Sequence, residues 1–232
     1  MYIYFFFFLY AYDAYECYGG VRMRQTVADF SKITAILRGY DYEQVEAAVR
    51  VLCGSVVSAV EITLNRVDSK DTIRRIADKY GDRIAVGAGT VLNAEDLQDV
   101  VEAGADFVLA PSMFPRDMLD YCRHHHVISV PGVFSPSEVR QCAKDGADIL
   151  KIFPAGTVGS KYFTDIQAPF GKLPLMAVGG INAENMAEYF RAGASFVGIA
   201  SGLFQKEDIL NRNATGMARS LEVFARQMEV VS

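Results

Sequence analysis

Residues 144–153 read "KDGADILKIF", and their pattern is the clearest indication of how the chain folds. A charged, amphipathic segment ends at a glycine, and an apolar run that is typical of a buried strand follows directly. The same joint recurs as "EAGADFV" at 102–108 and "RAGASFV" at 191–197. Glycine is the residue that most readily adopts the left-handed conformation just after a helix. The recurrence therefore predicts a chain built from repeated helix-to-strand units.

Short apolar runs alternate with longer amphipathic stretches from about Ser31 onward. We expect strands at 33–37, 57–62, 84–88, 107–110, 127–130, 148–153, 175–178 and 196–200. We expect helices at about 41–52, 69–80, 94–103, 115–124, 135–144, 161–168, 183–191 and 207–228. Helix starts carry capping residues, with Asn93 before "AED", Ser135 three residues before Glu138, and Asn182 before "AEN".

Alternating apolar strands and amphipathic helices indicate a parallel sheet covered by helices. About eight strand-helix units are also the number that closes a barrel. The sequence predicts an α/β fold, a (β/α)8 TIM barrel in a single domain; the alternative is an open, doubly wound sheet. The stretch "GAGTVL" has one glycine too few for a dinucleotide fingerprint and follows the third strand, which favours the barrel.

The first residues, "MYIYFFFFLYAYDAYECYGG", do not share this pattern. They lack the basic region and cleavage site of a signal peptide, and a run of about ten apolar residues is too short to span a bilayer. We expect residues 1–22 to be an extension outside the fold, as an upstream start codon would produce, and residues 23–232 to form the barrel. A membrane-associating segment is the alternative.

Composition narrows the classes of partner. The formal net charge of −5 disfavours non-specific binding to nucleic acid or to an anionic membrane. The four cysteines have no spacing typical of a zinc site or a disulfide framework, which indicates free thiols in a reducing cytoplasm. The run His124 to His126 offers adjacent side chains that point in different directions on a helix, so we interpret it as a helix end and expect no metal.

Lys151 and Glu61 are the strongest candidates for chemistry, because each is a charged residue in an apolar strand near its carboxyl end. In a barrel these strand ends converge on one face, here called the mouth, where active sites lie. Burial lowers the pKa of a lysine, and a neutral amine can attack a carbonyl to form a Schiff base. A nearby carboxylate can then carry the proton. The alternative is a buried salt bridge without chemistry.

Other residues fall at the same end of the predicted strands. Phe153 has the same side-chain parity as Lys151 and is expected to wall the same pocket. "VGGIN" and "ASG" follow the last two strands, where barrels often bind phosphate through backbone N–H groups. Plain turns, surface charge or loop structure are the alternatives for these positions. The further candidates are Arg38, Thr90, Pro111, Gly179, Gly180 and Ser201.

With these residues in place, the chain resembles the 2-keto-3-deoxy-6-phosphogluconate / 4-hydroxy-2-oxoglutarate (KDPG/KHG) aldolase family of class I aldolases. The resemblance runs from about residue 33 to 204 in family order. The matching motifs are "AILRG", "VEITLN", "GAGTVLN", "LAPS", "VPGVFSPSE", "LKIFPAG" and "AVGGINAEN".

The resemblance implies a metal-independent and cofactor-free homotrimer that cleaves a 2-keto-3-deoxy-6-phospho sugar acid to pyruvate and glyceraldehyde 3-phosphate. It implies that Lys151 is the Schiff-base lysine and Glu61 the general acid/base. It also implies that Arg38 binds the substrate carboxylate. The implied pyruvate pocket is Thr90, Pro111 and Phe153, and the implied phosphate site is Gly179, Gly180 and Ser201.

Three positions bear on which sugar acid is the substrate. The phosphogluconate branch typically has arginine where this chain has Asn65 and threonine where it has Val178, whereas the phosphogalactonate branch usually has proline in place of Thr63. The signature is mixed and favours phosphogalactonate or dual specificity. Two other classes remain open on the residues alone, a phosphate-binding barrel synthase or epimerase without imine chemistry, and a non-catalytic sugar-phosphate binding protein.

Overall fold

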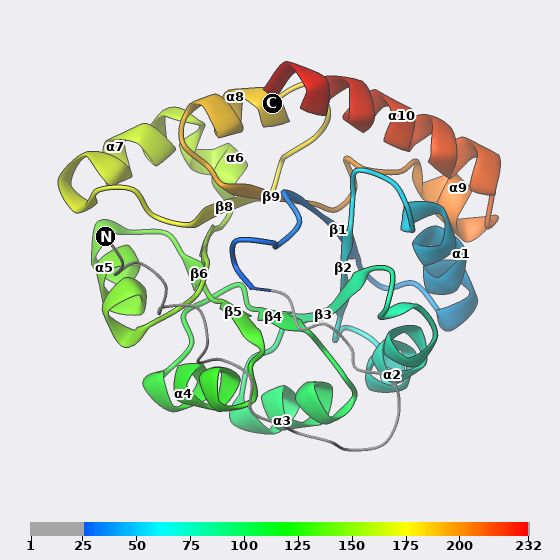
Figure 1. Ribbon diagram of the computed structural model, residues 1–232, viewed down its shortest axis with the longest axis horizontal. Coiled ribbons are helices and arrows are strands. Elements are labelled where there is room, and N and C mark those ends of the chain that lie inside the picture. Colours follow the sequence, from blue (N-terminus) through cyan, green and yellow to red (C-terminus); the bar gives the residue numbers. More distant parts are fainter. Residues whose placement is uncertain (1–25, 232) are drawn as a thin grey trace, which may run out of the picture.

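The strands form one parallel sheet that curls into a barrel, with the helices arranged around its outside (Figure 1). This computed structural model describes residues 26–231. The sheet order is β5-β4-β3-β2-β1-β9-β8-β7-β6, and every pairing is parallel. The strands are β1 (Ile33–Leu37), β2 (Ala59–Thr63), β3 (Ala85–Gly89), β4 (Phe107–Leu109), β5 (Ile128–Val130), β6 (Gly132–Val133), β7 (Leu150–Ile152), β8 (Leu175–Val178) and β9 (Phe196–Ile199).

The helices follow the strands in alternation, as the sequence pattern predicts. They are α1 (Tyr42–Leu52), α2 (Ser69–Tyr80), α3 (Ala94–Glu102), α4 (Arg116–His124), α5 (Pro136–Asp145), α6 (Ala155–Val158), α7 (Lys161–Phe170), α8 (Met186–Arg191), α9 (Lys206–Leu210) and α10 (Ala214–Val231). The predicted TIM barrel is thereby confirmed over the open sheet.

Nine strand segments fill eight barrel positions because strand pairing resumes after Pro131, so that β5, the strand predicted at 127–130, and the short β6 share one position. Proline has no N–H to donate to a ladder, so regular pairing stops there. Strand β5 pairs with β4, and β6 pairs with β7. Two backbone bonds close this seam: Ile149 N–H donates to the Ser129 carbonyl at 3.1 Å, and Lys151 N–H donates to the Pro131 carbonyl at 3.0 Å.

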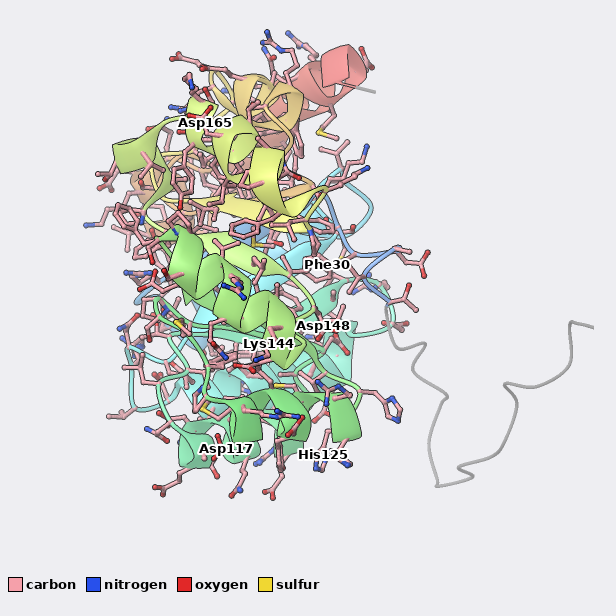
Figure 2. The ribbon with its side chains drawn as sticks, turned by 90° about the vertical axis from the view of Figure 1, so that its left-hand side faces the viewer. Phe30, Asp117, His125, Lys144, Asp148 and Asp165 are labelled. Carbon is pink, nitrogen blue, oxygen red and sulfur yellow. The ribbon has the colours of Figure 1, made fainter. Side chains whose placement is uncertain are left out.

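The end of the barrel opposite the mouth is packed with aromatic rings. Phe30, which precedes β1, lies edge-on to Phe107 and Phe196, with ring centroids 5.0 and 5.5 Å apart. Phe107 and Phe196 begin their strands, so the three rings, here called the floor, close the amino-terminal end of the barrel. Figure 2 shows Phe30 on the side where α4 ends near His125, away from Asp117 at the start of that helix.

The recurrent glycine joints have the predicted conformation. Gly104, Gly146 and Gly193 have φ values of 92°, 88° and 102°, which are left-handed. The aspartates that follow two of these glycines tie neighbouring strands together. Asp106 accepts a bond from the Val86 amide at 2.9 Å, and the Asp148 carboxylate accepts bonds from the Ser129 amide at 2.9 Å and its hydroxyl at 2.8 Å.

Two helix predictions require correction. The helix expected at 207–228 is divided into α9 and α10, because Arg212 has a left-handed φ of 52° and the Asn213 side-chain oxygen Oδ1 accepts the Gly216 amide, which starts a new helix. Helix α8 begins at Met186 rather than at 183, since Asn182 caps a turn instead, accepting the amides of Glu184 and Asn185. Asn93 and Ser135 cap their helices as predicted.

The prediction for residues 1–22 lies outside the described residues. Within 26–231, no helix combines the length and the apolar character that crossing a membrane requires.

Candidate functional site

Lys151 lies in the middle of β7 and points into the barrel. Ile149 packs in the barrel interior, whereas Ile152 packs against the helices outside. Because side chains alternate along a strand, Lys151 faces the interior, as Ile149 does. The side chain is 4% exposed. Its amine lies 4.9 Å from the ring centroid of Phe153, two residues along the same chain. The predicted apolar wall is therefore in contact range of the amine.

Glu61 enters the barrel from β2, where Val60 and Ile62 pack outward. It is 1% exposed, and its Oε2 atom has no hydrogen-bond partner among the described residues. Room for the carboxyl group comes from Gly89 on the adjacent strand: a Cβ at Gly89 would lie 1.6 Å from Glu61 Oε1. Glycine at this position is thus a steric requirement of the buried carboxylate.

Burial dominates the electrostatics of the pair. It lowers the pKa of the Lys151 amine, against the opposing attraction of Glu61, and Arg38 lowers it further. Burial likewise raises the pKa of the Glu61 carboxyl, against the positive charges of Lys151 and Arg38. Both shifts favour the neutral forms. No ion pair of 4.0 Å or less joins these two described side chains, so the salt-bridge interpretation lacks its defining contact.

Two loops bring further predicted residues to the same end. Pro111 lies against Gly132, where a Cβ would come 2.4 Å from the Pro111 carbonyl carbon, and Gly132 is the register partner of Lys151. Thr90 directly follows Gly89 and has a φ of 61°, in the left-handed region that β-branched residues rarely adopt. Such strain in a non-glycine residue is commonest at functional sites.

The loops after β8 and β9 lie side by side. A Cβ at Gly202 would lie 2.5 Å from the Ile181 carbonyl oxygen, which places Ser201 next to the Gly179–Gly180 turn. Gly179 and Gly180 have φ values of 95° and 79°, so both need glycine. A Cβ at Gly179 would also lie 3.4 Å from the Phe153 ring. The two predicted subsites are therefore contiguous.

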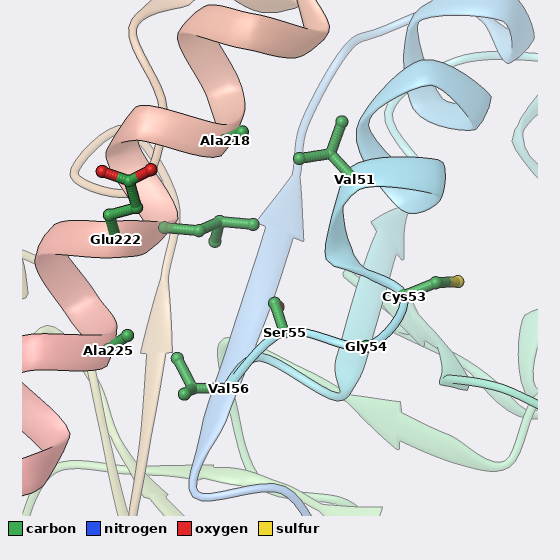
Figure 3. A pocket seen from close by; sticks show the side chains of 9 residues that line it. Val51, Cys53, Gly54, Ser55, Val56, Ala218, Glu222 and Ala225 are labelled. Atoms are coloured by element: carbon green, nitrogen blue, oxygen red, sulfur yellow. The ribbon is translucent and has the colours of Figure 1, made fainter.

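A surface groove of about 510 Å³ lies elsewhere, between the end of α1 and α10. Figure 3 shows Val51 and Val56 on one side of it and Ala218, Glu222 and Ala225 of α10 on the other, with the Cys53 side chain directed away from α10. Its lining includes none of the predicted site residues. It offers little chemistry, because burial raises the pKa of the Cys53 thiol and so disfavours the nucleophilic thiolate.

The histidine run ends a helix, as the sequence predicts. Helix α4 ends at His124, His125 stacks on Tyr121 at a centroid distance of 4.1 Å, and His126 has a left-handed φ of 55°. Among residues 26–231, no three or more histidine, cysteine, aspartate or glutamate side chains gather in a way that could hold a metal ion.

Comparison with known protein families identifies the family to which the chain belongs. The family model described as KDPG and KHG aldolase matches residues 24–219. The chain belongs to this family. A 2-dehydro-3-deoxy-6-phosphogalactonate aldolase of Escherichia coli (strain K12) is 28% identical over 198 residues, covering 85% of this chain and 96% of that protein. A probable 2-dehydro-3-deoxy-6-phosphogalactonate aldolase of Rhizobium meliloti (strain 1021) is 32% identical, covering 75% of this chain and 82% of its own.

A solved structure of the KDPG/KHG family shows the same fold. The KDPG aldolase of Legionella pneumophila, with pyruvate captured as a covalent carbinolamine intermediate, superposes with a TM-score of 0.77 at 25% identity. The match covers 84% of this chain and 94% of that one. In that protein, covalent capture of pyruvate is therefore established chemistry.

Three features of this KDPG/KHG family barrel could not be predicted from the sequence patterns: the steric roles of Gly89 and Gly132, and the buried, unpaired hydroxyl of Thr63. Gly89 and Gly132 stand out only when the partner strand is known, since the atoms that exclude a side chain there come from Glu61 and Pro111. Thr63 is buried with an unpaired hydroxyl, yet threonine in a strand is ordinary. Its parity with Glu61 is the signal that could have marked it.

Proposed function

We propose that this chain is a class I aldolase that cleaves a 2-keto-3-deoxy-6-phospho sugar acid to pyruvate and glyceraldehyde 3-phosphate, with Lys151 as the Schiff-base residue. The observation that carries the proposal is a lysine buried in the mouth of an aldolase-family barrel, with its pKa lowered by burial. A neutral amine in that position is a nucleophile toward the keto group.

The reaction follows from the two buried groups. The Lys151 amine attacks C2, and the C2 oxygen takes a proton from solvent and leaves as water, which gives an iminium. The Glu61 carboxylate accepts the proton of the C4 hydroxyl as the C3–C4 bond breaks, and the electron pair of that bond moves into the iminium to give an enamine. The aldehyde leaves, Glu61 returns a proton to C3, and water hydrolyses the iminium to release pyruvate and the free amine. The raised pKa of Glu61 suits a group that both takes and gives a proton.

The remaining predicted residues bind the substrate in this proposal. Arg38 supplies positive charge for the carboxylate, since its charge already acts on both Lys151 and Glu61. Thr90, Pro111 and Phe153 enclose the pyruvate portion. The backbone of Gly179 and Gly180, together with Ser201, receives the phosphate, which the adjacency of the two loops supports.

The substrate in this proposal is phosphogalactonate, phosphogluconate or both. The two aldolases compared by sequence carry the phosphogalactonate name, and Val178 and Asn65 agree with that branch. Thr63 departs from it. Measurement of kcat/KM for the two sugar acids, which differ only in configuration at C4, decides between them.

Borohydride reduction in the presence of pyruvate tests the imine. We expect one covalent adduct, found by peptide mass spectrometry on Lys151. The matched control is Lys161, an exposed lysine that pairs with Asp165 at 2.6 Å and is expected to stay unlabelled. Absence of an adduct on Lys151 would contradict the proposal and favour a synthase or epimerase. An adduct without cleavage of either sugar acid would favour a binding protein.

Metal dependence is tested separately. The proposed mechanism assigns every proton and electron pair to Lys151, Glu61 and water, so full activity in EDTA is expected. Loss of activity in EDTA that added divalent metal restores would contradict a metal-independent aldolase.

Assembly, location and domain limits are further proposals. We infer a homotrimer in the cytoplasm from the family resemblance and from the free thiols of Cys122 and Cys142, whose pKa values burial raises to about 12 and about 11. Light scattering on the purified protein tests the trimer. We also propose that residues 1–22 lie outside the barrel domain, since the family match begins at residue 24. A chain started at Met23 should keep its solubility and kcat/KM.

A further inference from the structure

Three side-chain oxygens in the described residues are buried without a hydrogen-bond partner, and two of them lie at the mouth. These are Glu61 Oε2 and Thr63 Oγ1 on β2, and the third is Thr34 Oγ1 on β1. An unpaired buried hydroxyl costs about 1–3 kcal/mol, and valine has the same shape without that cost. A hydroxyl in such a position therefore indicates that a group from outside the protein supplies its hydrogen-bond partner.

Strand β2 orients Thr63 toward the substrate space. Ala59 packs with the barrel interior while Val60 and Ile62 pack outward, so Glu61 and Thr63 both face inside. Thr63 is the last residue of the strand, one side-chain level nearer the mouth than Glu61. Both residues are 1% exposed.

The backbone around Thr63 is held on two sides, which fixes the direction in which its side chain leaves the strand. The Thr63 carbonyl accepts a bond from the Ser69 hydroxyl at 2.8 Å. The following amide, of Leu64, donates to the Gly89 carbonyl at 2.9 Å. Gly89 is also the register partner of Thr63, and it carries no side chain that could cover the hydroxyl. The backbone that carries the Thr63 side chain is therefore in place before any ligand arrives.

We propose that Thr63 is a specificity-determining residue whose hydroxyl donates a hydrogen bond to the C4 oxygen of the sugar acid. This inference rests on the proposed aldolase function. Glu61 is the group that takes the C4 hydroxyl proton, so an adjacent hydroxyl on the same strand reaches the same oxygen. As that proton moves to Glu61 and the C3–C4 bond breaks, the oxygen becomes the aldehyde carbonyl. Thr63 O–H donates to it throughout and is itself unchanged.

Position on β2 makes Thr63 selective for C4 rather than for pyruvate. The pyruvate carbons are held from the opposite side by Lys151 on β7 and by the Pro111 loop that packs against Gly132. The two candidate sugar acids differ only in the configuration at C4. The Thr63 hydroxyl therefore favours the sugar acid whose C4 configuration directs the C4 oxygen toward both Glu61 and Thr63. A site that hydrogen-bonds a substrate hydroxyl discriminates strongly against a substrate that cannot make that bond.

Thr34 provides a matched control. It is a threonine on the neighbouring strand, 0% exposed, with an equally unpaired hydroxyl. Its register partner on β2 is Ala59, whereas Glu61 pairs with Ile36 one level nearer the mouth. Thr34→Val removes the same atoms from the same barrel interior at a depth that substrate does not reach.

The experiment compares Thr63→Val, Thr63→Ser and Thr34→Val by three measurements. They are kcat/KM for both sugar acids, the rate of borohydride trapping with pyruvate, and the melting temperature. We expect Thr63→Val to lower kcat/KM for the preferred sugar acid about 10- to 100-fold, as loss of one hydrogen bond to a reacting group does. The ratio of the kcat/KM values for the two sugar acids should fall toward 1. Pyruvate trapping should be unchanged, the melting temperature should stay the same or rise because valine removes the cost of an unpaired hydroxyl, and Thr63→Ser should restore the preference.

Thr34→Val should leave kcat/KM and pyruvate trapping at wild-type values, with a melting temperature equal to or above that of the wild type. Equal effects of Thr63→Val on both sugar acids, an effect on pyruvate trapping as large as on cleavage, or behaviour matching Thr34→Val would each overturn the inference. A wild-type protein that traps no pyruvate would overturn the proposed function itself and this inference with it, so the two failures are distinguishable.

Discussion

At the floor of the barrel, the half-buried carboxylate of Asp148 accepts two hydrogen bonds from Ser129, whereas at the mouth the buried carboxyl of Glu61 has an oxygen without a partner. Ser31, also near the floor, donates to the Ile33 carbonyl and accepts the Ser58 amide. Asp148 and Ser31 are thus completed by the fold, whereas Glu61 and Thr63 at the mouth and Thr34 deeper in the barrel each keep an unpaired oxygen. We infer that the polar groups around the floor serve stability and that the two unpaired groups at the mouth are left for a ligand.

Replacing Lys151 by methionine is the strongest test of this contrast. We expect turnover to fall by about 10⁴-fold or more, since removal of a covalent nucleophile commonly costs that much. The melting temperature should move by less than about 4 °C, because the variant removes a costly buried amine and keeps its volume. Steady-state kinetics and calorimetry measure the two effects. Global unfolding of the variant would instead assign Lys151 a structural role.

Glu61→Gln separates proton transfer from imine formation. We expect cleavage to slow by about 10²- to 10⁴-fold, the usual contribution of a general acid/base. Pyruvate should still be trapped on Lys151, because the amine remains. Glu46→Gln, at a surface carboxylate that pairs with Lys79, is the control and should leave cleavage intact. Equal loss of trapping and cleavage would show that Glu61 acts through the fold.

Phe30→Ala addresses the floor and should give the reverse profile. Loss of a ring that is 4% exposed and packed between Phe107 and Phe196 is expected to lower the free energy of unfolding by about 3–5 kcal/mol. The folded fraction should keep its kcat. Urea unfolding and active-site titration measure the two quantities. Phe170→Ala, at a 37% exposed ring, should change stability by less than about 0.5 kcal/mol.

The smallest expected effect concerns pH. Burial lowers the Lys151 pKa most, and the Arg38 charge lowers it further. Arg38→Gln should therefore raise that pKa, so the neutral amine appears at higher pH. The measurement is the pH dependence of Lys151 labelling by a small uncharged electrophile. Arg66→Gln, at an arginine paired with Asp68, should leave the profile in place. A shift to lower pH in Arg38→Gln would contradict the assignment.

The same shift has a stability consequence of definite sign. Because the folded chain holds Lys151 with a lowered pKa, the unfolded chain binds more protons at this group between the two pKa values. The contribution of Lys151 to stability therefore falls as the pH drops from the ordinary lysine value of about 10.4 to the lowered one. Lys151→Met removes that dependence.

The sequence predicts what local chemistry decides. Lys151 and Glu61 are conspicuous because a charge among apolar neighbours is rare, and the glycine joints are conspicuous because a left-handed residue must end those helices. The seam at Pro131 and the break at Asn213 depend on partners distant in sequence or on a single side-chain cap, which periodicity does not detect. The steric role of Gly89 is clear only from the adjacent strand. Thr63 stands out in the sequence as a departure from the phosphogalactonate pattern, but its unpaired buried hydroxyl is known only from the structure.

The aromatic floor has a consequence for isotope exchange. Since Phe30, Phe107 and Phe196 pack the amino-terminal end of the barrel, bulk water reaches Glu61 from the mouth side, where substrate sits. A proton taken from the C4 hydroxyl is thus shielded from exchange while the aldehyde remains in place.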